Sequence, residues 1–183
     1  ATSFSLLAEA LDADADTAGD ADVESDADVE SDADAPPAGP LRLYVAPDGD
    51  DSRDGSSEAE AVLTLRRVQE LLVTLEPTTD IEVRIAPGRY FGQTVEWTWT
   101  RPTQTIRFMP LHDDRDRPIF DGCLDDSSSR ECPGGTWFRL RHSAGEETNL
   151  HFEYIRVEHY GTAISFNGGR NDEADSNGSN RIY

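Results

Sequence analysis

The chain has 183 residues, enough for one sizeable domain, and its formal net charge is −21. So acidic a chain would repel the phosphates that dominate nucleic-acid affinity, and it has no basic patch for anionic lipid, so we expect no nucleic-acid partner. No apolar run approaches the roughly 18 residues of a membrane span, and we expect none. Acidic surfaces can still hold cations, or meet an anionic glycan through bridging calcium.

Residues 1–40 contain twelve acidic residues and no basic one. They include the repeat DADVES and end in the Pro/Gly-rich run APPAGP. Like charges repel and this composition offers little apolar surface to bury, so the segment is expected to be a disordered acidic spacer. Calcium sequestration by the carboxylates from Asp22 to Asp34 is the alternative. The first residues, ATSFSLLAEAL, fit either the remnant of a trimmed export signal or an ordinary chain end.

The folded part is expected to span residues 41–183. LRLYVAP predicts a short strand, and an Asp/Gly-rich loop follows it. Ser57 and Glu60 form the S-x-x-E pattern of a capping box, which predicts a helix start. An apolar stripe at steps of three and four supports the helix, and Pro77 is expected to close it. The stripe consists of Val62, Leu65, Val68, Leu72 and Leu75.

After this helix, every apolar run is short and typical of a strand. The runs are IEVRIAPG, TVEWTWT, TIRFMP, PIFDG, TWFRLR, LHFEYIRVEHYG, TAISFNGG and NRIY. With no helices between them, they predict a mostly β protein, either an antiparallel sandwich with a helical insertion or a coil of short parallel strands. No two-residue Asn-Gly or Asp-Gly hairpin joins equal alternating strands, which disfavours the sandwich.

The order of LYVAPDGDDSRDGSS, AVLTLRRVQELL and IEVRIAPGRYFG resembles the start of secreted right-handed parallel β-helix proteins of the pectate-lyase-like type. FEYIRVEHYGTAISFNGG and SNRIY are similar to successive turns of such a coil. The resemblance covers residues 41–183 and implies a parallel β-helix whose N-terminal end is capped by the α-helix. We expect residues 41–183 to be the N-terminal part of a longer β-helix domain, apparently truncated at the C-terminus.

The resemblance also implies a secreted or envelope-anchored, carbohydrate-active protein, of the polysaccharide lyase or hydrolase type. A non-enzymatic glycan-binding or adhesive surface protein is the alternative. Lyases of the family use an Arg or Lys base with calcium, and hydrolases use paired aspartates. Neither set can be placed on this chain, so the catalytic residues stay unknown, although Arg139, Arg141 and Arg156 lie on expected strands.

Calcium is the expected cofactor, with Asp48, Asp50 and Asp54 as candidate ligands. Asp50, Ser52, Asp54 and Gly55 fit the front half of an EF-hand-type loop, D-x-S-x-D-G. The twelfth position is Ala61, where a bidentate carboxylate is required. The same residues therefore also fit a turn leading into the helix.

Cys123 and Cys132 lack the spacing of a metal site. In an exported protein they would form a disulfide that pins a loop, stabilising the fold by roughly 2–3 kcal/mol.

Val95, Trp97 and Trp99 share one strand face, where they could stack on sugars but are better explained as core. Two groups of polar residues show no catalytic spacing. The first is His112 with the aspartates that follow it, expected to be a solvated loop, and the second is His151, Glu153 and His159.

Overall fold

The computed structural model describes residues 39–112, 117–141, 148–167 and 181–182. The predicted acidic spacer and the residues from Asp113 to Asp116 lie outside these ranges, apart from Gly39 and Pro40. The described part is mostly β, with parallel sheets and a single helix. No helix in it is long and apolar enough to cross a membrane.

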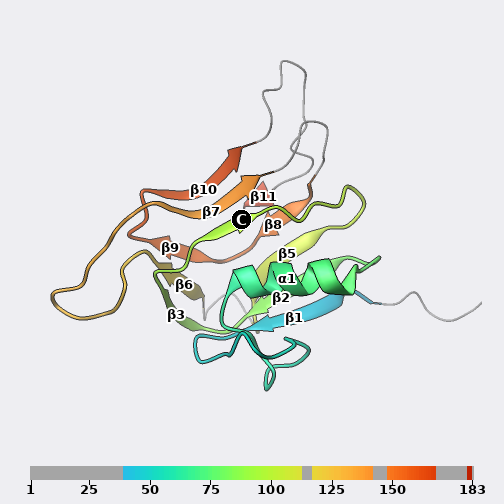
Figure 1. Cartoon of the computed structure of the whole chain (residues 1–183), viewed down its shortest axis with the longest axis horizontal. Helices are drawn as coiled ribbons and strands as arrows, with labels where there is room; N and C mark the ends of the chain where they lie inside the picture. The colour runs from blue at the N-terminus through green and yellow to red at the C-terminus, as the bar shows by residue number, and fades with distance from the viewer. Residues whose placement is uncertain (1–38, 113–116, 142–147, 168–180, 183) are drawn as a thin grey trace, which may run out of the picture. The chain divides into compact units, whose positions relative to one another are not determined.

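Three sheets are built from short strands, and every strand pair in the described ranges is parallel (Figure 1). Sheet A has the order β1-β2-β5-β8-β11, sheet B has β3-β6-β9, and sheet C has β10-β7-β4. The elements in chain order are β1 Leu41–Val45, α1 Leu65–Leu75, β2 Ile81–Ile85, β3 Gly88–Phe91, β4 Val95–Trp97, β5 Ile106–Pro110, β6 Pro118–Asp121, β7 Thr136–Arg141, β8 Leu150–Phe152, β9 Arg156–Glu158, β10 Thr162–Asn167 and β11 Arg181–Ile182.

From β2 onward the chain visits sheets A, B and C in the same order three times and then returns to sheet A with β11. Each visit adds a strand beside the previous one in the same sheet. The parallel pairing excludes an antiparallel sandwich for the described strands, because such a sandwich would pair neighbouring strands in opposite directions.

Residues in register stack on one another in the core. On sheet A, Val83 lies beside Phe108, which lies beside Phe152, and the two phenyl rings stack with centroids 4.9 Å apart. Tyr90 stacks on Phe120 in sheet B at 4.8 Å. In β4, β5 and β8 alternate residues thus bury apolar side chains while the residues between them are more exposed, as a period of two requires.

The predicted core role of the tryptophan strand is confirmed. Trp97 is fully buried and meets Phe108 edge-on at 5.2 Å, and Trp99 and Val95 are also buried. Neither Trp97 in β4 nor Trp99 just after it is exposed enough to stack on a sugar.

The helix exists as predicted, but it starts later than the capping box suggested. Its N-cap is Thr64, whose hydroxyl accepts the Arg67 amide, whereas Ser57 and Glu60 form a turn ahead of it. Asp51 explains the shift, since its carboxylate accepts the amides of both Leu63 and Thr64 at 2.9 Å. This long-range contact holds the chain extended until residue 64, and local pattern could not reveal it.

The buried side of α1 packs against β1 and β4, the first strands of sheets A and C (Figure 1). Leu65, Val68, Leu71 and Leu72 are buried there. The Gln69 side-chain carbonyl accepts the amide of Thr98 at 2.6 Å, which ties the helix to the strand beneath it. The helix ends at Leu75, with Glu76 in a left-handed conformation just before Pro77.

Candidate acid–base site

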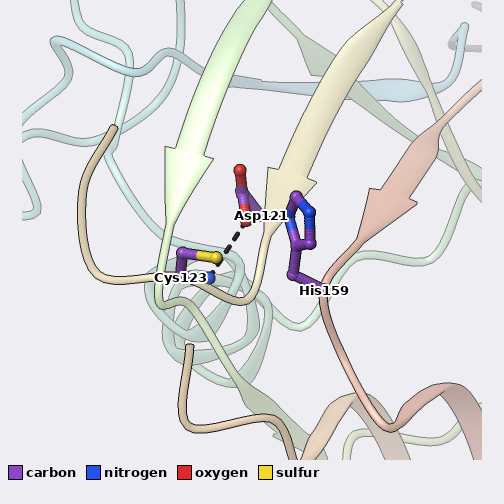
Figure 2. A group of neighbouring side chains, drawn as sticks. All are labelled: Asp121, Cys123 and His159. Carbon is purple, nitrogen blue, oxygen red and sulfur yellow. Dashed lines mark hydrogen bonds and ion pairs between the residues drawn. The ribbon is translucent and has the colours of Figure 1, made fainter. Parts of the chain in front are cut away.

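A cluster of charged side chains gathers at the carboxyl end of sheet B. Asp121 is the last residue of β6, and in register it lies between Phe91 of β3 and Glu158 of β9. Because the strands are parallel, their ends meet at one edge, and His159 follows Glu158 directly. Figure 2 shows Asp121, Cys123 and His159 gathered where these strands end.

Asp121 is a fully buried carboxylate with charged and polar partners on several sides. One oxygen accepts the Cys123 amide at 3.0 Å and contacts His159 Nδ1 at 2.7 Å, and the other accepts the Arg89 guanidinium. Burial by itself raises the pKa of the Asp121 carboxyl, but the hydrogen bonds from Cys123, His159 and Arg89 outweigh it and hold the pKa below its usual value. The buried aspartate is therefore ionised at neutral pH.

Gly122 lets the backbone of His159 approach the strand end. A Cβ on Gly122 would lie 2.4 Å from the His159 carbonyl oxygen, much closer than any side chain allows. The Gly122 amide also donates to the Glu158 carbonyl at 2.8 Å. His159 itself has φ of 58°, a left-handed conformation that is uncommon outside glycine. Such backbone strain is often found at functional positions.

The two contacts of the His159 ring select one tautomer. Nδ1 lies against an ionised carboxylate and so carries the proton, while Nε2 faces an Arg130 nitrogen at 3.4 Å. Arginine can only donate, so Nε2 must offer its lone pair. A histidine oriented in this way by an aspartate can accept a proton at Nε2. The His159 side chain is 38% exposed, and a reactant at Nε2 would take the place of the Arg130 contact.

Two further ion pairs keep the cluster close to neutral. Glu158 contacts Arg89 at 2.9 Å and also pairs with Arg156. The Glu158 and Asp121 carboxylates raise the pKa of Arg89, so that side chain stays charged. Two arginines thus balance two carboxylates, and none of these four groups serves as a free acid or base.

Tyr160 closes the inner side of the cluster. Its hydroxyl donates to the carbonyls of Gln93 and Asp121. Burial, together with the nearby Asp121 charge, raises the pKa of Tyr160 to about 12. The phenol therefore stays protonated and positions backbone rather than transferring protons.

The predicted disulfide between Cys123 and Cys132 is confirmed. It closes a loop that starts beside Asp121 and also carries Arg130. Ligand atoms of Asp121, Cys123 and His159 all lie within 4.8 Å of one another, a spacing that could hold a metal ion. With the Cys123 sulfur bonded to Cys132, only the aspartate and the histidine are available as ligands.

The predicted calcium ligands lie elsewhere, in the loop between β1 and α1. One oxygen of Asp50 accepts the Ser52 amide at 2.8 Å, and one of Asp54 accepts the Ser56 amide at 2.9 Å. These hydrogen bonds lower the pKa of both exposed carboxyls. In the same loop Gly49 packs against the Val62 carbonyl, a close approach that is expected if these residues form a turn leading into the helix. Calcium at Asp48, Asp50 and Asp54 stays a prediction.

His151, Glu153 and His159, which the sequence groups together, lie at two different sites in the structure. His151 and Glu153 line an open cleft of about 460 Å³ beside sheet A, together with Arg107 and Tyr154. Glu153 accepts two hydrogen bonds from Arg107, at 2.9 and 3.0 Å. His159 belongs instead to the cluster at the end of sheet B.

The three arginines that the sequence placed on strands do lie on them. Arg139 and Arg141 in β7 both pair with Glu96, at 3.7 and 2.8 Å, and Arg156 in β9 pairs with Glu158. Sequence reasoning missed Asp121 and Arg89. The available signal was an Asp-Gly pair at the end of a predicted strand, since that position often ends a strand beside a turn.

No protein-family model matches the chain, and no curated protein matches it. Among solved structures, a rhamnogalacturonan lyase is similar with a TM-score of 0.42 and 22% identity, over 63% of this chain. The chain spans 28% of the length of that lyase.

Proposed function

We propose that the described strands form successive turns of a right-handed parallel β-helix with α1 as its N-terminal cap. Support comes from the repeated order of sheets A, B and C and from parallel pairing throughout the described ranges. Parallel crossovers are right-handed in nearly all proteins. The helix lies against the first strands of two sheets, where an apolar core would otherwise face solvent.

We further propose that the protein is carbohydrate-active, a polysaccharide lyase or hydrolase that uses His159 for proton transfer. The observation that carries this proposal is the Asp121–His159 contact of 2.7 Å, which leaves Nε2 as the proton acceptor of the ring, where a reactant would displace the 3.4 Å contact from Arg130. Both cleavage chemistries need such a group near the glycosidic oxygen or the carbon beside a uronate carboxylate.

Elimination fits the cluster better than hydrolysis. Hydrolysis uses two carboxyl groups on either side of the bond, one of them protonated. Here Asp121 is buried and ionised, and Glu158 is held by two arginines. A single oriented base with arginines around it instead resembles what proton abstraction beside a carboxylate requires.

An exported location accompanies this proposal. The Cys123–Cys132 bond is of the kind that persists in oxidising compartments and is rare where thiols are kept reduced. The chain would then meet polysaccharide outside the cytoplasm, either secreted or anchored to the envelope.

The test is incubation of the purified chain with a panel of anionic and neutral polysaccharides, followed by chromatography and detection of unsaturated sugar ends. Cleavage should appear on at least one polymer and fall by 10²-fold or more in His159→Ala, the range of general-base loss. His112→Ala, which changes an exposed histidine that follows β5 of sheet A, should retain activity. Equal activity of both variants would exclude His159 as the base.

A non-enzymatic glycan-binding or adhesive role is the second candidate. The polar cleft beside sheet A favours it, because Arg107, His151 and Glu153 could contact sugar hydroxyls there. Retention on an immobilised polysaccharide without any cleavage product would support this role over an enzymatic one.

Calcium at the Asp48–Asp54 loop is a separate part of the proposal. If the ion binds there, millimolar calcium should raise the melting temperature, and Asp50→Asn with Asp54→Asn should remove the increase. An unchanged melting temperature in the parent chain would exclude this site.

A further inference from the structure

The cluster at the end of sheet B brings together three kinds of atom that can bind a metal ion. A carboxylate oxygen of Asp121, the sulfur of Cys123 and a ring nitrogen of His159 lie within 4.8 Å of one another. Oxygen, sulfur and nitrogen ligands are the set that zinc uses in proteins, at about 2.0–2.3 Å from the metal. Around a tetrahedral ion such ligands are about 3.5 Å apart, so a shift on the order of 1 Å would suffice.

The strand ends, rather than the disulfide, hold two of these ligands in place. Asp121 and Glu158 pair in register, and the Gly122 amide bonds to the Glu158 carbonyl. His159 follows immediately, with its carbonyl against Gly122. The aspartate and the histidine should therefore keep their positions when the Cys123–Cys132 bond is broken.

We propose that the disulfide masks a zinc-type metal site, and that reduction exposes Asp121, Cys123 and His159 as its ligands. Cys132 is exposed whereas Cys123 is fully buried. A dithiol reductant can attack the Cys132 sulfur, so the S–S bond breaks and Cys123 leaves as a thiolate. The second thiol of the reductant then releases Cys132, and the reductant becomes a cyclic disulfide.

The charge of the cluster explains why a cation would bind after reduction. Arg89 and Arg156 already balance Asp121 and Glu158. A Cys123 thiolate adds one negative charge beside the Asp121 carboxylate, which Arg89 and Arg156 together with Glu158 leave close to neutral; Arg130, 3.4 Å from His159 Nε2, is the remaining described cation at the cluster. A divalent ion removes this repulsion and changes no oxidation state when it binds.

Metal binding would also change the role of His159. A metal on Nδ1 replaces the hydrogen bond to Asp121 that orients the ring as a base. Arg89 would remain as the outer partner of the Asp121 ligand, a position that commonly tunes metal affinity. Reduction together with zinc would thus switch the cluster from proton transfer to metal binding. The metal site itself requires no activity on polysaccharide.

Cobalt(II) provides the test, because a cysteine thiolate bound to it produces a charge-transfer band in the near ultraviolet. Cys132→Ser frees the Cys123 thiol without a reductant, and Cys123→Ser is the matched control with the same open loop and one free thiol. We expect the band at one equivalent of cobalt in Cys132→Ser and its absence in the oxidised parent chain. Zinc affinity in Cys123→Ser should be weaker by at least about 100-fold, since loss of outer partners alone costs 10- to 100-fold.

His159→Ala in the Cys132→Ser background should weaken cobalt binding to the level of Cys123→Ser. Circular dichroism checks each fold, and the parent chain reduced by a phosphine replaces Cys132→Ser if that variant does not fold. Equal bands in the two cysteine variants, or no band in a folded reduced chain, would overturn the proposal. If both Cys132→Ser and the phosphine-reduced parent chain unfold, the proposal is overturned as well, because the site needs the paired strand ends.

Discussion

Replacing Gly122 with alanine should destabilise the protein, since the added methyl group meets backbone that cannot rotate away. The new Cβ would lie 2.4 Å from the His159 carbonyl oxygen, 2.8 Å from its carbon and 3.1 Å from the Tyr160 nitrogen. Carbon–oxygen contacts normally need about 3.3 Å or more, so the chain after β9 must move by close to 1 Å.

The expected cost lies at the upper end of overpacking penalties of about 1–3 kcal/mol. Alanine also lowers the conformational entropy of the unfolded chain, which stabilises the folded state by about 0.4–1 kcal/mol. The free energy of unfolding should therefore fall by about 2 kcal/mol in total. With a urea dependence of about 2 kcal/mol per molar, the unfolding midpoint should fall by about 1 M.

Gly39→Ala is the matched control, because nothing lies within 4 Å of a Cβ at that position. Urea unfolding followed by tryptophan fluorescence measures both variants, and the Gly39→Ala midpoint should stay close to that of the parent. Coincident midpoints for the two variants would refute the close approach of His159 to β6, and with it the geometry of the acid–base site.

Three other outcomes are expected. The pKa of Asp121 is lower in the folded than in the unfolded state, so its stabilisation is present above about pH 3.9 and is lost as the pH falls through the folded pKa. The urea unfolding midpoint, measured from pH 7 to 2, should therefore fall at acid pH, and it should fall less in Asp121→Asn. Phe108→Ala should lower the melting temperature by about 10 °C in calorimetry, because it removes a buried ring that contacts three others, whereas exposed Val73→Ala should change it little. Reduction should lower the free energy of unfolding by about 2–3 kcal/mol, and an identical urea midpoint for reduced and oxidised protein would argue against stabilisation by the Cys123–Cys132 loop.

Local pattern was enough to predict most elements of the described chain. Alternation with a period of two placed Val95, Trp97 and Trp99 on a buried face, and a period near 3.6 located the helix that ends before Pro77. The lack of metal-site spacing, taken with an exported setting, predicted the bond between Cys123 and Cys132. The start of the helix was misplaced because Asp51 acts on residues 63 and 64 from across the loop.

The spacing of apolar residues along the chain predicted the strands and the helix, because it is a local property. It put Leu75 on the buried stripe of the helix, where the side chain is 51% exposed, and left out Leu71, which is buried. That Arg89, Asp121 and His159 meet depends instead on how the strands pack in three dimensions. Arg89 lies 32 residues before Asp121 and His159 lies 38 residues after it, in β3, in β6 and directly after β9. Alternation tells which face of a strand a side chain occupies, but the pairing register decides which side chains share that face, and register arises from packing of the whole core.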